Sequence, residues 1–471
     1  MLSGFPADLA EAAPPPLAIP EASETTPQGP GEGGPFGFMT GMAKSDFLLG
    51  DMWDLRSGLS RYGISFALSE TSEVLGNLTG GIHTGFDYDG LTQAALQLDT
   101  QQAFGWYGGT FNISALQIHG RNLSTDNLLT LQTASGIEAD RATRLWELWY
   151  QQKFLDEDRL DVRLGQMSLD QEFIVSQQAL LFVNTSFGWP LVPSIDLPGG
   201  GPAYPLSALG VRLRARPTNA LTALIAVTNG NPAPNNLGDP QVTNPSGTSF
   251  PLNGGALVIG ELQYVYPALG AMVAPNQQEV HQGTYKIGFW YNSENFDDLQ
   301  FDNTGLSLAN PLSTGIPQTH HGNYSLYGVV DQQVWTSPGG SNLNAFTRLM
   351  GTPQGDRNFV VFSLNAGLTL QGPLPGRDSD VLGFGMGYGK VSGSAAALDR
   401  QTAFFTGAFV PAQTGETFIE LTYQYQLIPS VHLQPDLQYV FNPGAGIANP
   451  NVPNQSVKNE LVLGLRVNIA F

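Results

Sequence analysis

The chain contains no cysteine among its 471 residues, and only 13% of its residues are charged, about half of the usual quarter. The absence of cysteine excludes disulfide bonds, thiolate metal ligands and a cysteine nucleophile. Basic residues are also scarce, since 20 Lys and Arg stand against 40 Asp and Glu and the formal net charge is −20. A nucleic-acid-binding protein needs a basic face to neutralise phosphates, so we predict no nucleic-acid partner.

Long hydrophobic runs are missing as well. No run of about 18 apolar residues occurs, so the sequence predicts no membrane-spanning helix. The mean hydropathy of −0.09 is that of a soluble protein, but a membrane β-barrel has a similar average because half of each strand faces a wet lumen. The 56 glycines, the 10% aromatic content and the few charges fit an outer-membrane barrel and a secreted all-β protein equally. The strand periodicity must decide between them.

The N-terminal segment differs in composition from the rest of the chain. It begins MLSGFPADLAEAAPPP and has neither the basic start nor the apolar stretch of a signal peptide. We expect residues 1–44 to form a disordered or extended acidic arm, with the export signal removed or the gene start misplaced. Residues 45–62 should form a short amphipathic helix that begins after Ser45 and stops at Gly63, and residues 63–471 should form the barrel.

Alternation of apolar and polar residues with a period of two is the main signal after residue 63. Its stripes run for about ten residues, the length of a tilted membrane strand, whereas strands of soluble sheets usually have five or six. Arg212, Arg214 and Arg216 share one strand face, which a wet lumen accepts and a dry core does not. Trp146, Trp290 and Tyr291 near strand ends fit the aromatic girdle of such a barrel.

The alternating segments number sixteen, an even count that suits a bacterial barrel with antiparallel closure. We therefore predict an all-β, sixteen-stranded antiparallel transmembrane barrel with inward-folded outer loops. Long connections are expected at residues 120–143, 167–207, 230–255, 294–322 and 392–416, all at the outer end. The predicted strands are residues 63–73, 93–99, 110–119, 144–153, 159–166, 207–216, 221–229, 256–266, 284–293, 323–333, 344–350, 358–370, 380–390, 417–427, 431–441 and 460–471.

The last predicted strand is the sharpest local signal. Its apolar stripe runs from Leu461 to Ile469 at every second position, and the chain stops at Phe471. A terminal aromatic on an amphipathic strand is similar to the signal that the outer-membrane insertion machinery reads. We therefore expect that machinery, outer-membrane lipid and lipopolysaccharide to be partners, in the outer membrane of a Gram-negative bacterium.

Several stretches resemble the carbohydrate-selective porins of the OprB family. They are LLGDMWDLRSGLSRYGI before the first strand, QIHGRNLSTDNLLTLQTASGIEADRATRLWELWY, the segments QEFIVSQ, FVNTSFGWP and GGGPAYP, and QPDLQYVFNP near the end. The resemblance covers nearly everything from about residue 45 onward. It implies a sixteen-stranded channel for passive, selective diffusion of small carbohydrates, monosaccharides such as glucose, with a monomer expected and a trimer as the alternative. The alternatives are a general or differently selective diffusion porin and a structural outer-membrane barrel.

The resemblance also implies a channel constriction with two arginines and a glutamate on the second and third outer loops. Opposed guanidinium and carboxylate groups suit a sugar, because one donates and the other accepts hydrogen bonds to hydroxyl groups. In the second outer loop we expect Arg121, Glu138 and Arg141 to bind substrate, and Arg144 at the edge of the following strand is the next candidate. The alternative is that these charges only brace the loop, through Glu138–Arg141 and Asp140–Arg144 pairs.

The third outer loop, residues 167–207, is the longest and is expected to fold inward. Its Asp170 and Glu172 are candidates for lining the lumen, as are Arg212 and Arg214 on the strand that follows. Its Phe187 and Trp189 could stack on a sugar face, although packing against the barrel wall is the more favoured interpretation.

Three other signals carry no site. The neighbours His320 and His321 point in opposite directions on extended chain, so they do not predict a shared metal ion. Glycines at 383, 385, 387 and 389 follow the period of a strand and not of a phosphate loop, and they predict a glycine-lined lumen wall. Nothing points to a nucleophile with its base, so we predict no enzyme activity, no cofactor and no metal.

Overall fold

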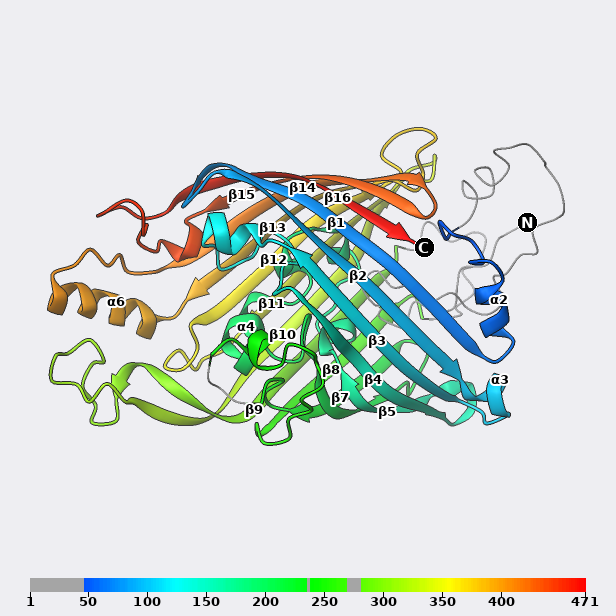
Figure 1. Cartoon of the computed structure of the whole chain (residues 1–471), viewed down its shortest axis with the longest axis horizontal. Helices are drawn as coiled ribbons and strands as arrows, with labels where there is room; N and C mark the ends of the chain where they lie inside the picture. Colours follow the sequence, from blue (N-terminus) through cyan, green and yellow to red (C-terminus); the bar gives the residue numbers. More distant parts are fainter. Residues whose placement is uncertain (1–45, 235–237, 269–280) are drawn as a thin grey trace.

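Sixteen strands form one closed antiparallel barrel, as predicted, in the computed structural model, which describes residues 46–234, 238–268 and 281–471. Each strand pairs with its neighbours along the chain, and β1 pairs with β16 to close the barrel (Figure 1). The predicted arm, residues 1–44, lies outside the described residues. The strands are β1 (Ile64–Gly81), β2 (Gly85–Asp99), β3 (Gly109–Gly120), β4 (Ala142–Phe154), β5 (Leu160–Met167), β6 (Ala208–Ala215), β7 (Leu221–Asn229), β8 (Ala256–Tyr266), β9 (Gly283–Asp302), β10 (Pro317–Thr336), β11 (Asn342–Gly351), β12 (Val360–Gln371), β13 (Val381–Val391), β14 (Gly415–Ile428), β15 (Val431–Phe441) and β16 (Lys458–Ala470).

The two ends of the barrel differ. One end carries the C-terminus and the short helices α2 (Leu55–Ser60) and α3 (Thr100–Phe104), whereas helix α6 (Gly393–Thr406) lies at the opposite end (Figure 1). The long connections join β3 to β4, β5 to β6, β7 to β8 and β13 to β14, so strand direction places all of them at the α6 end. This end is called the loop end below. None of the helices in the described part of the chain is long and apolar enough to cross a membrane.

The strands have two chemically different faces, as the alternation predicted. On β1, Glu73 is 1% exposed and faces the lumen, whereas its neighbour Val74 is 46% exposed on the outside. The girdle expectation was correct for Tyr291, which is exposed. It was wrong for Trp146 and Trp290, which are buried inside, because a strand position next to a girdle residue points to the opposite face.

Several predicted boundaries need correction. Strand β1 runs to Gly81 and not only to residue 73, and β2 begins at Gly85 and not at residue 93, so this hairpin extends further toward the loop end. Strand β9 continues past residue 293 and β10 begins before residue 323, because the ladder goes on through the pairs His321–Asn295 and His320–Phe296. The expected loop of residues 294–322 is therefore mostly a protruding hairpin. The N-terminal helix is α2 alone and not residues 45–62. Left-handed backbone at Met52, Trp53 and Asp54 prevents an earlier start, since only a right-handed backbone continues an α-helix.

The third outer loop, residues 168–207, folds inward and packs on the inner wall. It contains helix α4 (Leu191–Asp196) and buries Phe173, Ile174 and Trp189 in one apolar cluster with wall residues such as Trp290. The glycine stripe of β13 makes room for this loop, because a Cβ at Gly385 would lie 2.6 Å from Cζ of Phe187. Phe187 is 1% exposed, which supports packing over sugar stacking for this ring.

Candidate functional site

Polar groups of the barrel wall hold the inward loop by its main chain. The Arg348 guanidinium on β11 donates to the main-chain oxygens of Ile174 (3.1 Å), Gly188 (2.8 Å) and Ser186. In the opposite sense, Glu420 on β14 accepts hydrogen bonds from the main-chain nitrogens of Val183 (2.6 Å) and Asn184 (3.1 Å). The loop is therefore fixed to the barrel wall at strands β11 and β14.

Three of the four residues predicted to line the lumen meet in one ion-pair cluster. Glu172 of the inward loop lies 2.6 Å from Arg212 Nε on β6 and 2.5 Å from Arg163 Nη1 on β5. Arg212 also pairs with Asp161, whose second oxygen lies 2.6 Å from Arg214 Nε. This arginine cluster thus ties the start of the inward loop to strands β5 and β6.

The electrostatics of Glu172 follow from these contacts. Burial by itself raises the pKa of the Glu172 carboxyl. The positive charges of Arg163, Arg212 and Arg214 lower this pKa by more than burial raises it, so the pKa is about 2. Asp170, the fourth predicted lining residue, has a different role. Its oxygens accept hydrogen bonds from Ser168 Oγ (2.6 Å) and Tyr204 N (2.8 Å), so it braces the loop internally.

Arg144 combines burial with hydrogen-bond donors that no described residue uses. It lies on β4 opposite Leu116 of β3 and faces the lumen side of the wall, with 1% of its surface exposed. Its Nε, Nη1 and Nη2 atoms have no hydrogen-bond partner within the described chain. A buried charge without a hydrogen-bond partner is costly, so this guanidinium is a strong donor whose hydrogen bonds the described residues do not use.

Arg121 and Arg141 are exposed residues at the two ends of the second outer loop. Neither makes a side-chain hydrogen bond or an ion pair to any residue that the structure describes. The pairs Glu138–Arg141 and Asp140–Arg144, which would have braced the loop, do not form among these residues. The predicted constriction residues therefore do not form one contact cluster, but their guanidinium groups keep their donors available.

Glu138 lies within the electrostatic influence of the acids Asp89 and Glu73. Ser124 donates to it from its main-chain nitrogen (3.3 Å) and its Oγ (3.1 Å). Burial, together with the negative charges of Asp89 and Glu73, holds the pKa of Glu138 well above its usual range, although the hydrogen bonds from Ser124 lower it. This carboxyl group is thus positioned by the loop beside the β1–β2 wall.

That wall carries a charged group that was not predicted from the sequence. Glu73 of β1 pairs with Arg466 of β16, and its second oxygen has no partner among the described residues. One oxygen of Asp89 on β2 also lacks a partner there. Their strand phase could have revealed both acids, because each occupies a lumen-facing position of its alternating stripe.

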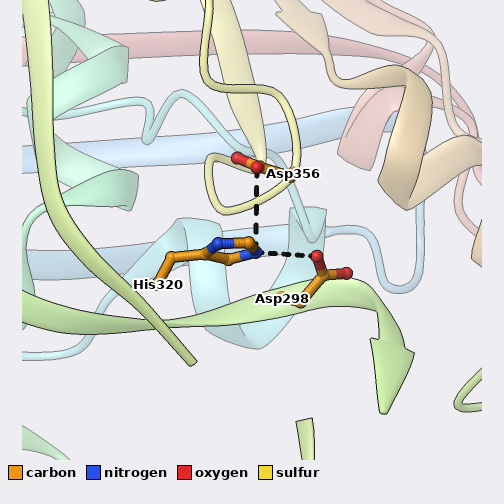
Figure 2. Close-up of side chains that lie close together, drawn as sticks. All are labelled: Asp298, His320 and Asp356. Carbon is orange, nitrogen blue, oxygen red and sulfur yellow. Dashed lines mark hydrogen bonds and ion pairs between the residues drawn. The ribbon is translucent and has the colours of Figure 1, made fainter. Parts of the chain in front are cut away.

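One group in the described part of the chain could hold a metal ion. Asp298, His320 and Asp356 lie together at the loop end, with ligand atoms within 4.8 Å of one another (Figure 2). The group lies on the β9–β10 hairpin and the β11–β12 connection, apart from the lumen residues above.

Comparisons with known proteins agree with this architecture. The model of the family described as carbohydrate-selective porin, OprB family, matches residues 83–471. Porin B of Pseudomonas aeruginosa is 25% identical over 453 residues, which cover 91% of this chain and 92% of that protein. A putative porin, QuiX, of Acinetobacter baylyi is 24% identical over 450 residues, which cover 90% and 93%. The high-pH structure of Pseudomonas putida OprB matches with a TM-score of 0.79 at 24% identity, covering 91% of this chain and 99% of that one.

Proposed function

The chain belongs to the carbohydrate-selective porins of the OprB family, and on this premise we propose that it passes small neutral sugars, monosaccharides such as glucose, by passive diffusion across the outer membrane. The family consists of outer-membrane channels and not of enzymes. A selective channel has to replace the hydrogen bonds that a sugar makes with water and then release the sugar. Several weak, charge-assisted contacts serve this purpose better than one tight pocket.

The observation that carries the proposal is the free hydrogen-bonding capacity of the arginines. Arg121, Arg141 and Arg144 have no side-chain partner in the described chain, and Arg144 is at the same time buried. A guanidinium has five N–H donors and no acceptor, so it matches the lone pairs of sugar hydroxyls. Glu138 would add a polar group of the opposite kind. In this proposal Arg121, Glu138 and Arg141 contact the passing solute, and Arg144 reaches it after the residues that cover its guanidinium shift.

The second set of lumen residues has a supporting role in this proposal. Glu172 pairs with Arg212, Arg214 pairs with Asp161, and Asp170 is satisfied within the inward loop. Groups whose hydrogen bonds are already made have less to offer a solute. They would shape the channel by fixing the loop, and they would contact sugar less than the unpartnered arginines do.

Reconstitution into liposomes tests the function. Swelling rates are compared for arabinose, glucose, sucrose and raffinose, with glucose and gluconate as a pair that differs in charge. If the channel is selective for sugars, the liposomes should swell fastest with monosaccharides. Their swelling rates should also fall more steeply from monosaccharides to larger sugars than solute size alone predicts. Faster swelling with gluconate than with glucose would favour the alternative, a channel of different selectivity. Rates that follow size alone would favour a general porin.

A further inference from the structure

Three side chains with metal-ligand chemistry meet at the loop end of the barrel, and each comes from a different segment (Figure 2). Asp298 lies on β9, His320 on β10 and Asp356 on the connection between β11 and β12. The Nε2 atom of His320 lies 2.8 Å from Oδ2 of Asp298 and 3.7 Å from Oδ2 of Asp356. All three ligand atoms lie within 4.8 Å of one another.

These separations suit one small ion. Zinc lies about 2.0–2.2 Å from nitrogen and carboxylate oxygen, so two ligand atoms of a tetrahedral site are about 3.4 Å apart. The observed separations lie on both sides of that value, and side-chain shifts of roughly an ångström would equalise them. We propose that Asp298, His320 and Asp356 bind a divalent transition-metal ion such as Zn²⁺.

Neighbouring hydrogen bonds orient two of the three ligands, as second contacts do in metal sites. Oδ1 of Asp298 accepts hydrogen bonds from the main-chain nitrogens of Gln300 (2.8 Å) and Phe301 (2.7 Å), which leaves Oδ2 directed at His320. Arg357 donates from Nε to Oδ1 of Asp356 (3.0 Å) and from Nη2 to Oδ2 (3.1 Å). Metal binding would keep the first of these Arg357 bonds and replace the second.

The type of ligand sets the class of metal. Calcium and magnesium are bound by oxygen ligands, and an imidazole nitrogen at the centre of the group does not suit them. One nitrogen and two carboxylate oxygens suit zinc, nickel or cobalt, with water completing the coordination. The two carboxylates exceed the single charge of Arg357, so the group also attracts a cation.

A bound ion would link the protruding β9–β10 hairpin to the β11–β12 connection. The main chain already joins them there, because Leu299 N donates to the main-chain oxygen of Asp356 (2.7 Å). The metal would add a second link at the rim. This proposal is independent of the sugar path, so sugar swelling rates need not change with zinc.

The test is calorimetric titration of the folded, tag-free protein in detergent with ZnCl₂, supported by the visible absorption of bound Co²⁺. We expect saturable binding of one ion per chain. His320→Gln and Asp298→Asn should each lower the affinity by about tenfold or more, because loss of a direct ligand should cost no less than loss of an outer contact. His321→Gln is the matched control, since this neighbouring histidine contacts Asn295 instead and should leave the affinity unchanged.

Heat-modifiable migration on gels checks that each variant is folded. Absence of saturable binding in the wild type would overturn the proposal. Equal affinities of the wild type and His320→Gln would overturn it as well, as would an equal loss in His320→Gln and His321→Gln.

Discussion

Arg348 on strand β11 donates a hydrogen bond of 2.8 Å to the main-chain oxygen of Gly188, in the middle of the inward loop. The same side chain reaches Ile174 and Ser186, and it is 1% exposed. One buried cation thus holds three separate points of the loop that narrows the channel. The selectivity proposed above depends on this loop keeping its position.

Replacing Arg348 by Ala should loosen the loop. Hydrogen bonds from a charged donor are worth about 1.5–3 kcal/mol each, and the substitution also leaves main-chain oxygens unsatisfied in a buried place. We expect higher and noisier single-channel conductance in planar bilayers, together with weaker discrimination between mono- and disaccharides. Arg159→Ala, in the exposed β4–β5 turn, is the control. If both variants behave like the wild type, Arg348 does not hold the loop.

The glycine stripe of β13 should not tolerate side chains. Gly385→Leu would place its Cβ against Phe187 and Phe182, and overpacking of a filled site costs about 1–3 kcal/mol. The temperature at which half of the Gly385→Leu protein shifts to the migration of the unfolded form should fall. Met386→Leu is the matched control on the adjacent residue, which points to the other face and should retain wild-type stability. An unchanged midpoint for Gly385→Leu would mean that the loop does not pack on the stripe.

Glu172 makes stability depend on pH in the acid range. Its arginine partners lower its folded-state pKa to about 2, below the value of the unfolded chain, so its contribution is present above about pH 4.5 and is lost as pH falls toward 2. The thermal midpoint of the wild type should therefore decrease over this range. Glu172→Gln should be less stable than the wild type at neutral pH and should depend less on pH between 4.5 and 2. Parallel curves for both proteins would contradict this assignment.

A charged substitution on the outer face of the barrel should impair folding into a membrane. Ile287 on β9 is 67% exposed on the outside, whereas its neighbour Lys286 is buried and donates to the main-chain oxygen of Val175 (2.7 Å). Ile287→Arg should cost on the order of 2–4 kcal/mol if this position lies near the middle of the membrane, and less near an interface. Lys286→Arg keeps the charge on the inner face and should fold well. Folding into lipid vesicles under urea measures both. Equal yields would contradict the assignment of the two faces.

The sequence predicted the strands better than the site. Period-two alternation reports which face of a strand is apolar, and that local property was enough for all sixteen strands. Alternation does not report what covers a lumen-facing residue. Arg212 and Glu172 were therefore expected to line the lumen, although they pair with each other inside the cluster.

The residue pairs that the sequence did not predict are contacts between distant segments of the chain. Asp356 and His320 are separated in sequence and meet only because the β9–β10 hairpin protrudes beyond the barrel, which the loop expected at residues 294–322 did not foresee. Likewise, the partner of Glu73 is Arg466 because the first and last strands close the barrel. Spacing along the chain carries no information on such pairs until the topology is known.

Sugar-dependent reduction of single-channel ion current tests the central claim most directly. We expect glucose to reduce the current of the wild type in a saturable way. Arg141→Ala removes donors and should weaken this effect by roughly tenfold, as loss of a charge-assisted hydrogen bond predicts. Glu138→Gln keeps size and should weaken it less, because burial and the nearby acids already hold the pKa of this carboxyl well above its usual range. Arg159→Ala should behave like the wild type. If both loop variants are folded and glucose reduces their current with the same concentration dependence as in the wild type, the account is contradicted. Selectivity would then lie elsewhere in the channel.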